Sequence, residues 1–130
     1  MNTITSYYSL RINVSDDKFE IVERILGVKQ NCPSFWELQF MLKNDNDYNL
    51  PFVDYFLSIL EGKYDQLEEI GIKRNDISVW FVYYYDSQCN MEFSPKDMYN
   101  LGKAGITLCI SCYDIHDYNV DYDEDGKVLQ

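Results

Sequence analysis

The chain has 130 residues, 46% of them hydrophobic and 16% aromatic, a composition typical of one folded domain and not of a disordered chain. Its 22 acidic residues outnumber its 11 basic ones and give a net charge of −11, which argues against binding to nucleic acid or to an anionic membrane, because both require a basic face. The longest apolar run, VWFVYYY, is too short to span a membrane. The first residues, MNTITSYYSLRINV, lack the basic start and the apolar segment of a signal peptide. We therefore expect a cytoplasmic protein with its four cysteines reduced.

The N-terminal part of the sequence predicts a strand, a helix and a second strand. Apolar and polar residues alternate over residues 7–14, as in a strand with one buried face. Ser15 is a good N-terminal cap for a helix over residues 16–26, and Gly27 is a good helix stop. The alternation returns over residues 35–42, which predicts the second strand.

The middle of the sequence predicts a long amphipathic helix and a central strand. Asn49 can cap this helix and Pro51 fits its first turn. Apolar residues then recur at helical spacing as far as residue 67, and Gly62 is expected to kink or divide the helix. Residues 77–85 are apolar at both alternating positions, which is typical of a strand covered on both faces.

Three further elements complete the predicted domain. Residues 89–93 are expected to form a short strand after a turn. Ser94 then caps a helix that ends by Gly102 or Gly105. Residues 106–114 alternate again and form the last core strand.

These elements follow one another in the order βαβαββαβ, which favours an α+β fold. Residues 1–115 are expected to form a single domain with one mixed or antiparallel sheet of about five strands and three helices packed mainly on one face. Residues 116–130 are expected to form an acidic C-terminal tail or a hairpin that turns at Asp125 and Gly126.

Acidic residues concentrate in two stretches. On the helix expected from residue 51 to residue 67, Asp54, Glu61 and Glu68 are spaced seven apart with Asp65 beside them, which predicts an acidic stripe. The second stretch, residues 114–125, holds no Lys or Arg and is interspersed with tyrosines, which are enriched in protein interfaces. A solvated acidic face and tyrosines that merely fill half-buried strand positions are the alternatives. We expect a basic partner to bind these surfaces, chiefly the second. The expected partner-binding residues are Tyr113, Asp114, Asp117, Tyr118, Asp121, Tyr122, Asp123, Glu124, Asp54, Glu61, Asp65 and Glu68.

Residues 121–126, DYDEDG, match the first six positions of a calcium-binding EF-hand loop. The sequence ends at the tenth position of such a loop, before the glutamate that the twelfth position requires, and no helical pattern precedes it. We therefore expect a hairpin or a tail in this stretch and no metal site.

Two other motifs could carry chemistry. Cys109 and Cys112 form a C-x-x-C motif, but residues three apart in a strand point to opposite faces, and no second pair of zinc ligands has a usual spacing. His116 lies between Asp114 and Asp117, where a carboxylate could orient it as a base, yet no nucleophile or phosphate-loop motif accompanies it. We expect surface or core roles for these residues, with no enzymatic activity and no cofactor.

Three stretches, YYSLRINV, VERILGVKQ followed by FWELQF, and GKAGITLCISCYDI, lie within residues 5–115. Their pattern resembles small bacterial α+β domains found beside polymorphic toxins, where small acidic proteins act as immunity partners. The resemblance implies a cytoplasmic inhibitor that binds and neutralises the secreted toxin domain of a contact-dependent growth inhibition system.

A nuclease toxin would be basic because its substrate is a polyanion, and an acidic partner would be steered onto it. The alternative is a non-catalytic binding module for a small ligand or another cellular protein, followed by an enzyme of unrecognised type.

Overall fold

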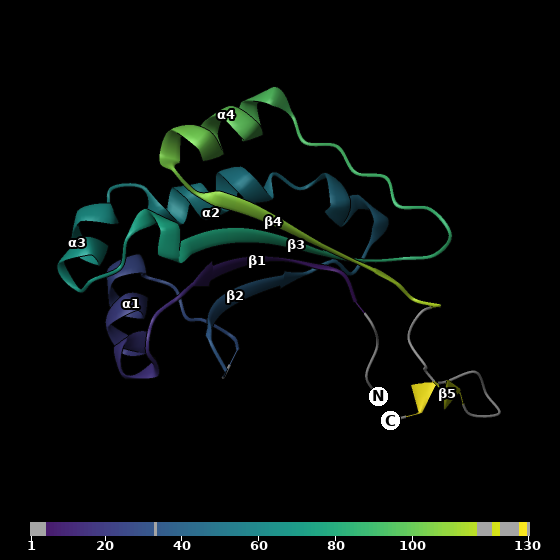
Figure 1. Cartoon of the computed structure of the whole chain (residues 1–130), viewed down its shortest axis with the longest axis horizontal. Coiled ribbons are helices and arrows are strands. Elements are labelled where there is room, and N and C mark those ends of the chain that lie inside the picture. The colour runs from purple at the N-terminus through teal and green to yellow at the C-terminus, as the bar shows by residue number, and fades with distance from the viewer. Residues whose placement is uncertain (1–4, 33, 117–120, 123–127, 130) are drawn as a thin grey trace.

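The computed structural model describes residues 5–32, 34–116, 121–122 and 128–129, and its centre is a mixed sheet of four strands (Figure 1). The strands are β1 (Tyr7–Ile12), β2 (Trp36–Met41), β3 (Ile77–Tyr85) and β4 (Thr107–Asp114). Their order in the sheet is β2-β1-β3-β4. β1 is antiparallel to β2 and to β3, whereas β4 is parallel to β3.

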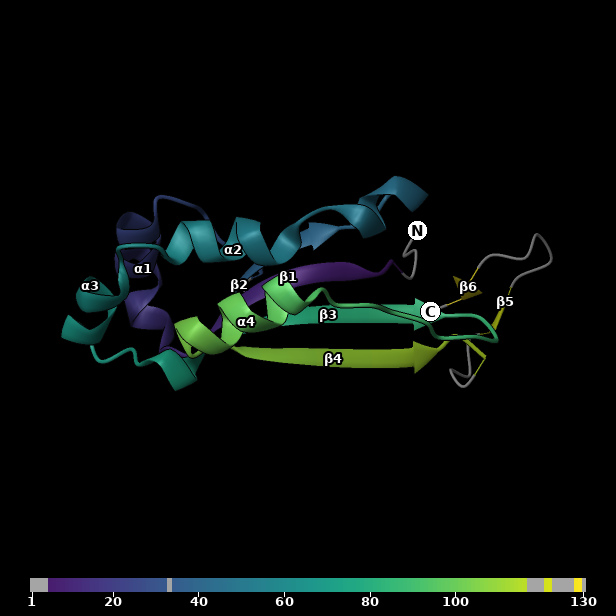
Figure 2. The ribbon, with the colours of Figure 1, turned by 90° about the horizontal axis from the view of Figure 1, so that it is seen from above.

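Two of the helices lie side by side across one face of the sheet, and two lie at one end of it (Figures 1 and 2). The face is covered by α2 (Phe52–Leu60) and α4 (Pro95–Ala104), and the end by α1 (Phe19–Leu26) and α3 (Tyr64–Glu69). Short 3₁₀ helices occupy Asp16–Lys18, Asp45–Asn49 and Arg74–Asp76. Among the described residues, no helix combines the length and the apolar character needed to cross a membrane.

The core forms where the apolar residues on one face of the strands pack against the helices. Leu10 of β1 is 0% exposed and lies in register between Leu38 of β2 and Val79 of β3. Burying one such side chain contributes about 1.5–3 kcal/mol to folding. The same face of the sheet and the inner faces of the helices supply the rest of the core. Its buried members include Tyr8, Ile12, Val22, Leu26, Trp36, Val53, Phe56, Leu60, Leu67, Ile77, Phe81 and Leu101.

Turn and cap residues act largely as predicted. Gly62 has a φ of +75° and divides the expected long helix into α2 and α3. The Ser94 side chain accepts a hydrogen bond from the backbone N–H of Asp97 and so caps α4. The prediction for Asn49 was wrong, because this residue ends a 3₁₀ helix and Pro51 directly precedes α2.

The prediction of about five strands was also wrong in detail, because residues 89–93 form no strand. Parallel neighbours cannot be joined by a tight turn, so the chain must cross from one end of β3 to the other before it enters β4. Residues 86–94 make the first part of this crossing and α4 makes the second. Met91 and Phe93 accordingly pack, partly buried, against the core.

The C-terminal stretch contains a separate pair of short strands, β5 (Asp121–Tyr122) and β6 (Val128–Leu129). They are antiparallel, with Asp121 opposite Leu129 and Tyr122 opposite Val128. The turn expected at Asp125 and Gly126 lies outside the described residues, as does most of the EF-hand-like stretch.

Replacing Leu10 by alanine should lower the free energy of unfolding by about 2–5 kcal/mol, since it leaves a cavity in the middle of the core. Ile110→Ala in β4 is the matched control, because Ile110 is 43% exposed and its loss should be about 1 kcal/mol or less. Urea unfolding followed by circular dichroism measures both. Equal losses would contradict the placement of Leu10 at the core centre.

Candidate functional site

The predicted acidic stripe is divided between α2, the turn after it, which holds Glu61, and α3, and it lies next to basic residues. Asp54 of α2 lies 3.5 Å from the Lys96 ammonium of α4. The cleft between these helices has a volume of about 770 Å³, and Asp54 and Glu61 share its lining with Lys96, Lys103 and Arg74. Cations therefore compensate the carboxylates on this side.

The remaining members of the stripe lie on α3. Asp65 and Glu68 are exposed, and Glu68 borders a second shallow hollow together with Lys73 and Arg74. The Arg74 guanidinium stacks 3.6 Å from the centre of the Tyr64 ring and donates a hydrogen bond to a backbone carbonyl of α4 at 2.5 Å. A basic partner would meet mixed charge on this face.

The structure places Tyr113 and Asp114, the first two expected partner-binding residues of the C-terminal part, at the end of β4. Tyr113 is exposed and its ring stacks on that of Tyr84, with centroids 5.2 Å apart. Asp114 accepts a hydrogen bond from the backbone N–H of His116 at 2.9 Å. Asp121 and Tyr122 are described only as part of β5. The other expected partner-binding residues of this stretch, Asp117, Tyr118, Asp123 and Glu124, lie outside the described residues.

His116 joins the end of β4 to the turn after β3. Its Nε2 lies 2.6 Å from Oδ1 of Asp86. This hydrogen bond is the main cause that lowers the pKa of the Asp86 carboxyl, with Ser87 contributing a second one. The carboxylate partner of the imidazole thus comes from the β3–α4 connection, a contact that the sequence did not indicate.

The two edges of the sheet differ in how they are covered. At β2, the Asn31 side-chain amide donates to the backbone O of Gln39 and accepts from its N–H. The Asn31 backbone N–H also donates to the carbonyl of Glu37, so the edge of β2 is partly occupied. At β4, no segment within the described residues pairs with the side that faces away from β3.

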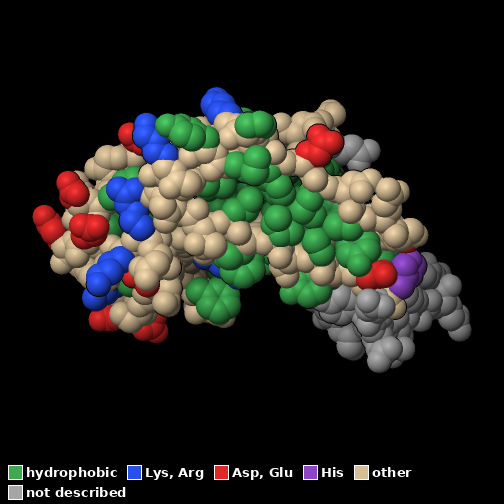
Figure 3. Space-filling model, turned by 45° about the horizontal axis from the view of Figure 1, so that its top comes forward, with side chains coloured by type: hydrophobic (Ala, Val, Ile, Leu, Met, Phe, Trp, Pro, Cys, Tyr) green, Lys and Arg blue, Asp and Glu red, His purple; other side chains and the backbone are tan. Residues whose placement is uncertain are grey.

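The outer edge of β4, which no described segment pairs with, is also apolar. Residues 107–113 contain no charged side chain, and Ile110 and Tyr113 are among the exposed large hydrophobic residues. Hydrophobic side chains form a continuous band below α4 and along β4, which ends at the side chain of His116 (Figure 3). Proteins usually protect edge strands with charges, proline or bulges, because an edge can template the strand of another chain.

A third hollow, the aromatic cleft, lies on the helix side of the sheet and is lined by aromatic rings. It has a volume of about 830 Å³ and lies between the start of α2, β3 and the connection that leads to α4. The Tyr8 and Phe52 rings stack in its wall at 3.7 Å between centroids, and the Tyr8 hydroxyl donates to the backbone carbonyl of Tyr48. Burial raises the pKa of Tyr8 to about 12, so this hydroxyl stays neutral at physiological pH.

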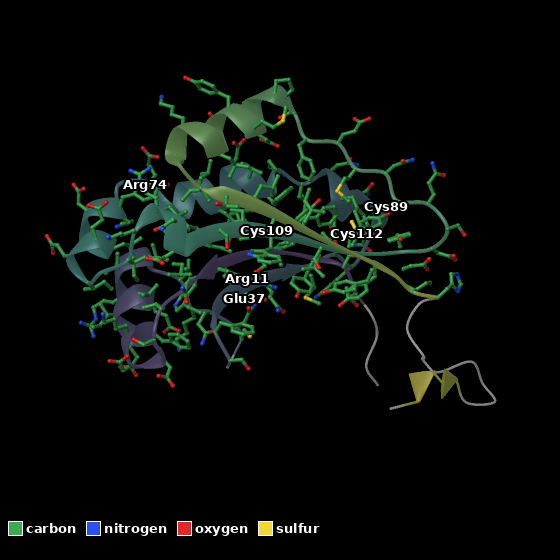
Figure 4. All side chains as sticks on the ribbon, viewed as in Figure 1. Arg11, Glu37, Arg74, Cys89, Cys109 and Cys112 are labelled. Atoms are coloured by element: carbon green, nitrogen blue, oxygen red, sulfur yellow. The ribbon has the colours of Figure 1, made fainter. Side chains whose placement is uncertain are left out.

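The open face of the sheet holds an ion pair that the sequence did not reveal (Figure 4). Arg11 Nε lies 2.5 Å from Glu37 Oε2, and the Glu37 side chain is only 1% exposed. The Arg11 guanidinium also stacks 3.9 Å from the centre of the Trp80 ring, and the Gln39 amide donates to the Glu37 carboxylate. Only the β1–β2 register, which sets Arg11 beside Glu37, brings the two charges together.

Metal and thiol chemistry can be judged only in the part of the chain that the structure describes. No cluster of three or more His, Cys, Asp or Glu side chains with the geometry of a metal site occurs there. Cys109 and Cys112 face opposite sides of the sheet, as the alternation predicts, because Cys109 is in register with Trp80 and Cys112 with Tyr83. The C-x-x-C motif is therefore not a spatial pair.

Replacing Arg11 by methionine should lower the free energy of unfolding by about 3 kcal/mol, because it leaves the Glu37 carboxylate buried without its cation. The double variant Arg11→Met/Glu37→Leu removes both charges and should regain much of this loss. A double-mutant cycle from urea unfolding measures the coupling. Strictly additive losses would show that the two side chains do not stabilise each other.

Comparison with known proteins gives no match, since no protein-family model, no curated protein and no solved structure matches the chain. The function must therefore be inferred from the surfaces themselves. Three of them stand out: the apolar edge of β4, the aromatic cleft and the mixed-charge face of α2, α3 and α4.

Proposed function

We propose that this protein is an immunity protein, which binds the toxic domain of a cognate secreted protein and neutralises it in the cytoplasm of the cell that makes both. The observation that carries the proposal is the edge of β4, which exposes apolar side chains and, among the described residues, has no strand on its outer side. A strand added to such an edge gains main-chain hydrogen bonds, while side-chain pockets give specificity.

The hydrogen-bonding direction of β4 supports this mode of binding. The backbone N–H of Ile115 donates to the carbonyl of Tyr85. Because the two directions alternate along a strand, the backbone groups of Leu108, Ile110 and Cys112 point to the outer side. An incoming strand would pair with these groups and cover the Ile110 side chain.

The charge of the chain favours a basic partner. The net charge is −11, and β4 leads through Asp114 directly into the second acidic stretch. The apolar edge would supply the area that is buried, and the acidic residues would speed the encounter. A nuclease domain fits this description because it must bind a polyanion. Inhibition would follow from occupying the toxin, with no turnover by the immunity protein.

Ile110→Lys should abolish protection when the protein is expressed together with the toxin domain encoded beside its gene. The buried lysine would weaken binding by roughly a hundredfold, a loss typical of a charge placed at the centre of an interface. Growth and co-purification are the readouts. Phe35→Lys is the matched control, because Phe35 is 55% exposed at the opposite edge of the sheet and should protect like the wild type.

Both variants must first give the circular dichroism spectrum of the wild type. Full protection by a folded Ile110→Lys variant would exclude the β4 edge as the docking surface. Failure of the wild type itself to protect or to co-purify would reject the immunity function.

Reversing charge in the C-terminal stretch should slow association with the toxin. The triple variant Asp117→Lys/Asp121→Lys/Asp123→Lys should reduce the association rate by on the order of tenfold at low salt, since electrostatic steering acts on the encounter. The same reversal on the helices should have less effect, because cations already lie beside those carboxylates.

The helix control is Asp54→Lys/Glu61→Lys/Glu68→Lys, and surface plasmon resonance at two salt concentrations measures both rates. A slow helix variant together with a normal C-terminal variant would move the docking surface to α2 and α3.

The aromatic cleft favours a second candidate, a non-catalytic binding module for a small planar ligand or another cellular protein. Its wall carries the rings of Tyr8, Phe52 and Phe81, which suits an apolar ligand held by a few polar groups. On this alternative the β4 edge is not the binding surface, so Ile110→Lys would retain the partner or ligand.

A further inference from the structure

Two cysteines that are distant in the sequence meet at the far end of the apolar band. The sulfurs of Cys89 and Cys112 lie 3.5 Å apart, and both residues are exposed free cysteines. Figure 4 shows them next to each other, with Cys109 further back along β4. Cys112 and Cys89 are thus a spatial pair, which the C-x-x-C motif is not.

We infer that Cys89 and Cys112 form an intramolecular disulfide when a small disulfide oxidant such as oxidised glutathione is present. The sulfurs need to approach by about 1.5 Å to reach a bond length of about 2.05 Å. Cys89 lies in a connection that contains no helix or strand between β3 and α4, so it can move while Cys112 stays within β4. This inference does not depend on the proposed function.

The bond would form through two thiol–disulfide exchanges. One cysteine thiolate attacks a sulfur of oxidised glutathione, which gives a mixed disulfide and releases one glutathione thiolate. The other cysteine thiolate then attacks the protein sulfur of the mixed disulfide, which gives the Cys89–Cys112 bond and releases the second glutathione. Two protein thiols are oxidised, one glutathione disulfide is reduced, and the two thiol protons pass to the released glutathione thiolates.

The reaction should accelerate as the pH rises. Partial desolvation, together with the hydrogen bond shared with Cys89, raises the pKa of the Cys112 thiol. Only the thiolate attacks a disulfide, so the reactive fraction of Cys112 grows with pH over the neutral and mildly alkaline range.

The disulfide would cross-link the β3–α4 connection to the edge strand β4. It closes a loop that contains all of α4 and most of β4, and it lies beside the contact between Asp86 and His116, which joins the same two segments. By restricting the unfolded chain it would stabilise the fold, and it would fix the position of the β4 edge relative to the connection.

The test is to incubate the purified full chain with oxidised glutathione, alkylate the remaining thiols and map the peptides by mass spectrometry without reductant. The wild type should yield one cross-linked peptide pair, Cys89 with Cys112. The melting temperature should rise by on the order of 10 °C relative to the reduced protein. Cys109→Ser is the matched control and should keep both the cross-link and the rise.

Cys89→Ser should lose the cross-link and keep a glutathione adduct at Cys112, while its circular dichroism spectrum shows that it folds. Two outcomes would overturn the inference. One is wild-type protein in which Cys89 and Cys112 remain open to alkylation after prolonged oxidation. The other is a cross-link that persists in Cys89→Ser, which would assign the disulfide to another pair.

Discussion

β4 runs parallel to β3, and parallel neighbours cannot be joined by a tight turn. The chain therefore leaves β3 at Tyr85, passes over the helix side of the sheet and re-enters it at Thr107. This crossing sets α4 beside α2 and encloses Leu101 in the core. It also places β4 last in the sheet and creates the connection that carries Cys89 and Asp86. The apolar edge, the aromatic cleft and the thiol pair all depend on this one choice of strand direction.

Charged side chains are distributed unequally between the helices and the edge strand β4. Lys and Arg side chains gather on the surface between α4 and α3, among the carboxylates of that region (Figure 3). Along β4, by contrast, residues 107–113 carry no charge and Asp114 ends the strand. Glu37, the one buried carboxylate within the described part of the chain, is neutralised by Arg11 within the sheet. Among the described residues, the carboxylates of the cleft between α2 and α4 thus lie beside cations, whereas the uncharged run of β4 ends in Asp114.

The strands with strict alternation could be predicted from the sequence, because burial on one face leaves a period of two. Leu10 and its neighbours in β1 show this, as do the stops at Gly27 and Gly62. Residues 89–93 misled the prediction, because their apolar residues also alternate although they serve the crossing and pair with no strand.

Contacts between neighbouring strands could not be predicted from the sequence, because periodicity indicates which face of a strand a residue occupies but not which residue lies beside it. Arg11 and Glu37 meet only through the register of β1 with β2. Cys89 meets Cys112, and Asp86 meets His116, only because β4 lies next to β3. Of the expected partner-binding residues, Asp54, Asp65 and Glu68 could be placed on helices in advance, whereas Glu61 lies in the turn after α2. The cations near these carboxylates could not be predicted.

The amide of Asn31 has a consequence for assembly. It occupies backbone groups of Gln39 that a further strand would need. Open-ended association of sheets edge to edge requires two unpaired edge strands on every molecule, and this amide obstructs the edge at β2. Edge-to-edge growth that begins at β4 would thus end after a single addition, and a strand bound there in the proposed mode would not seed a fibre.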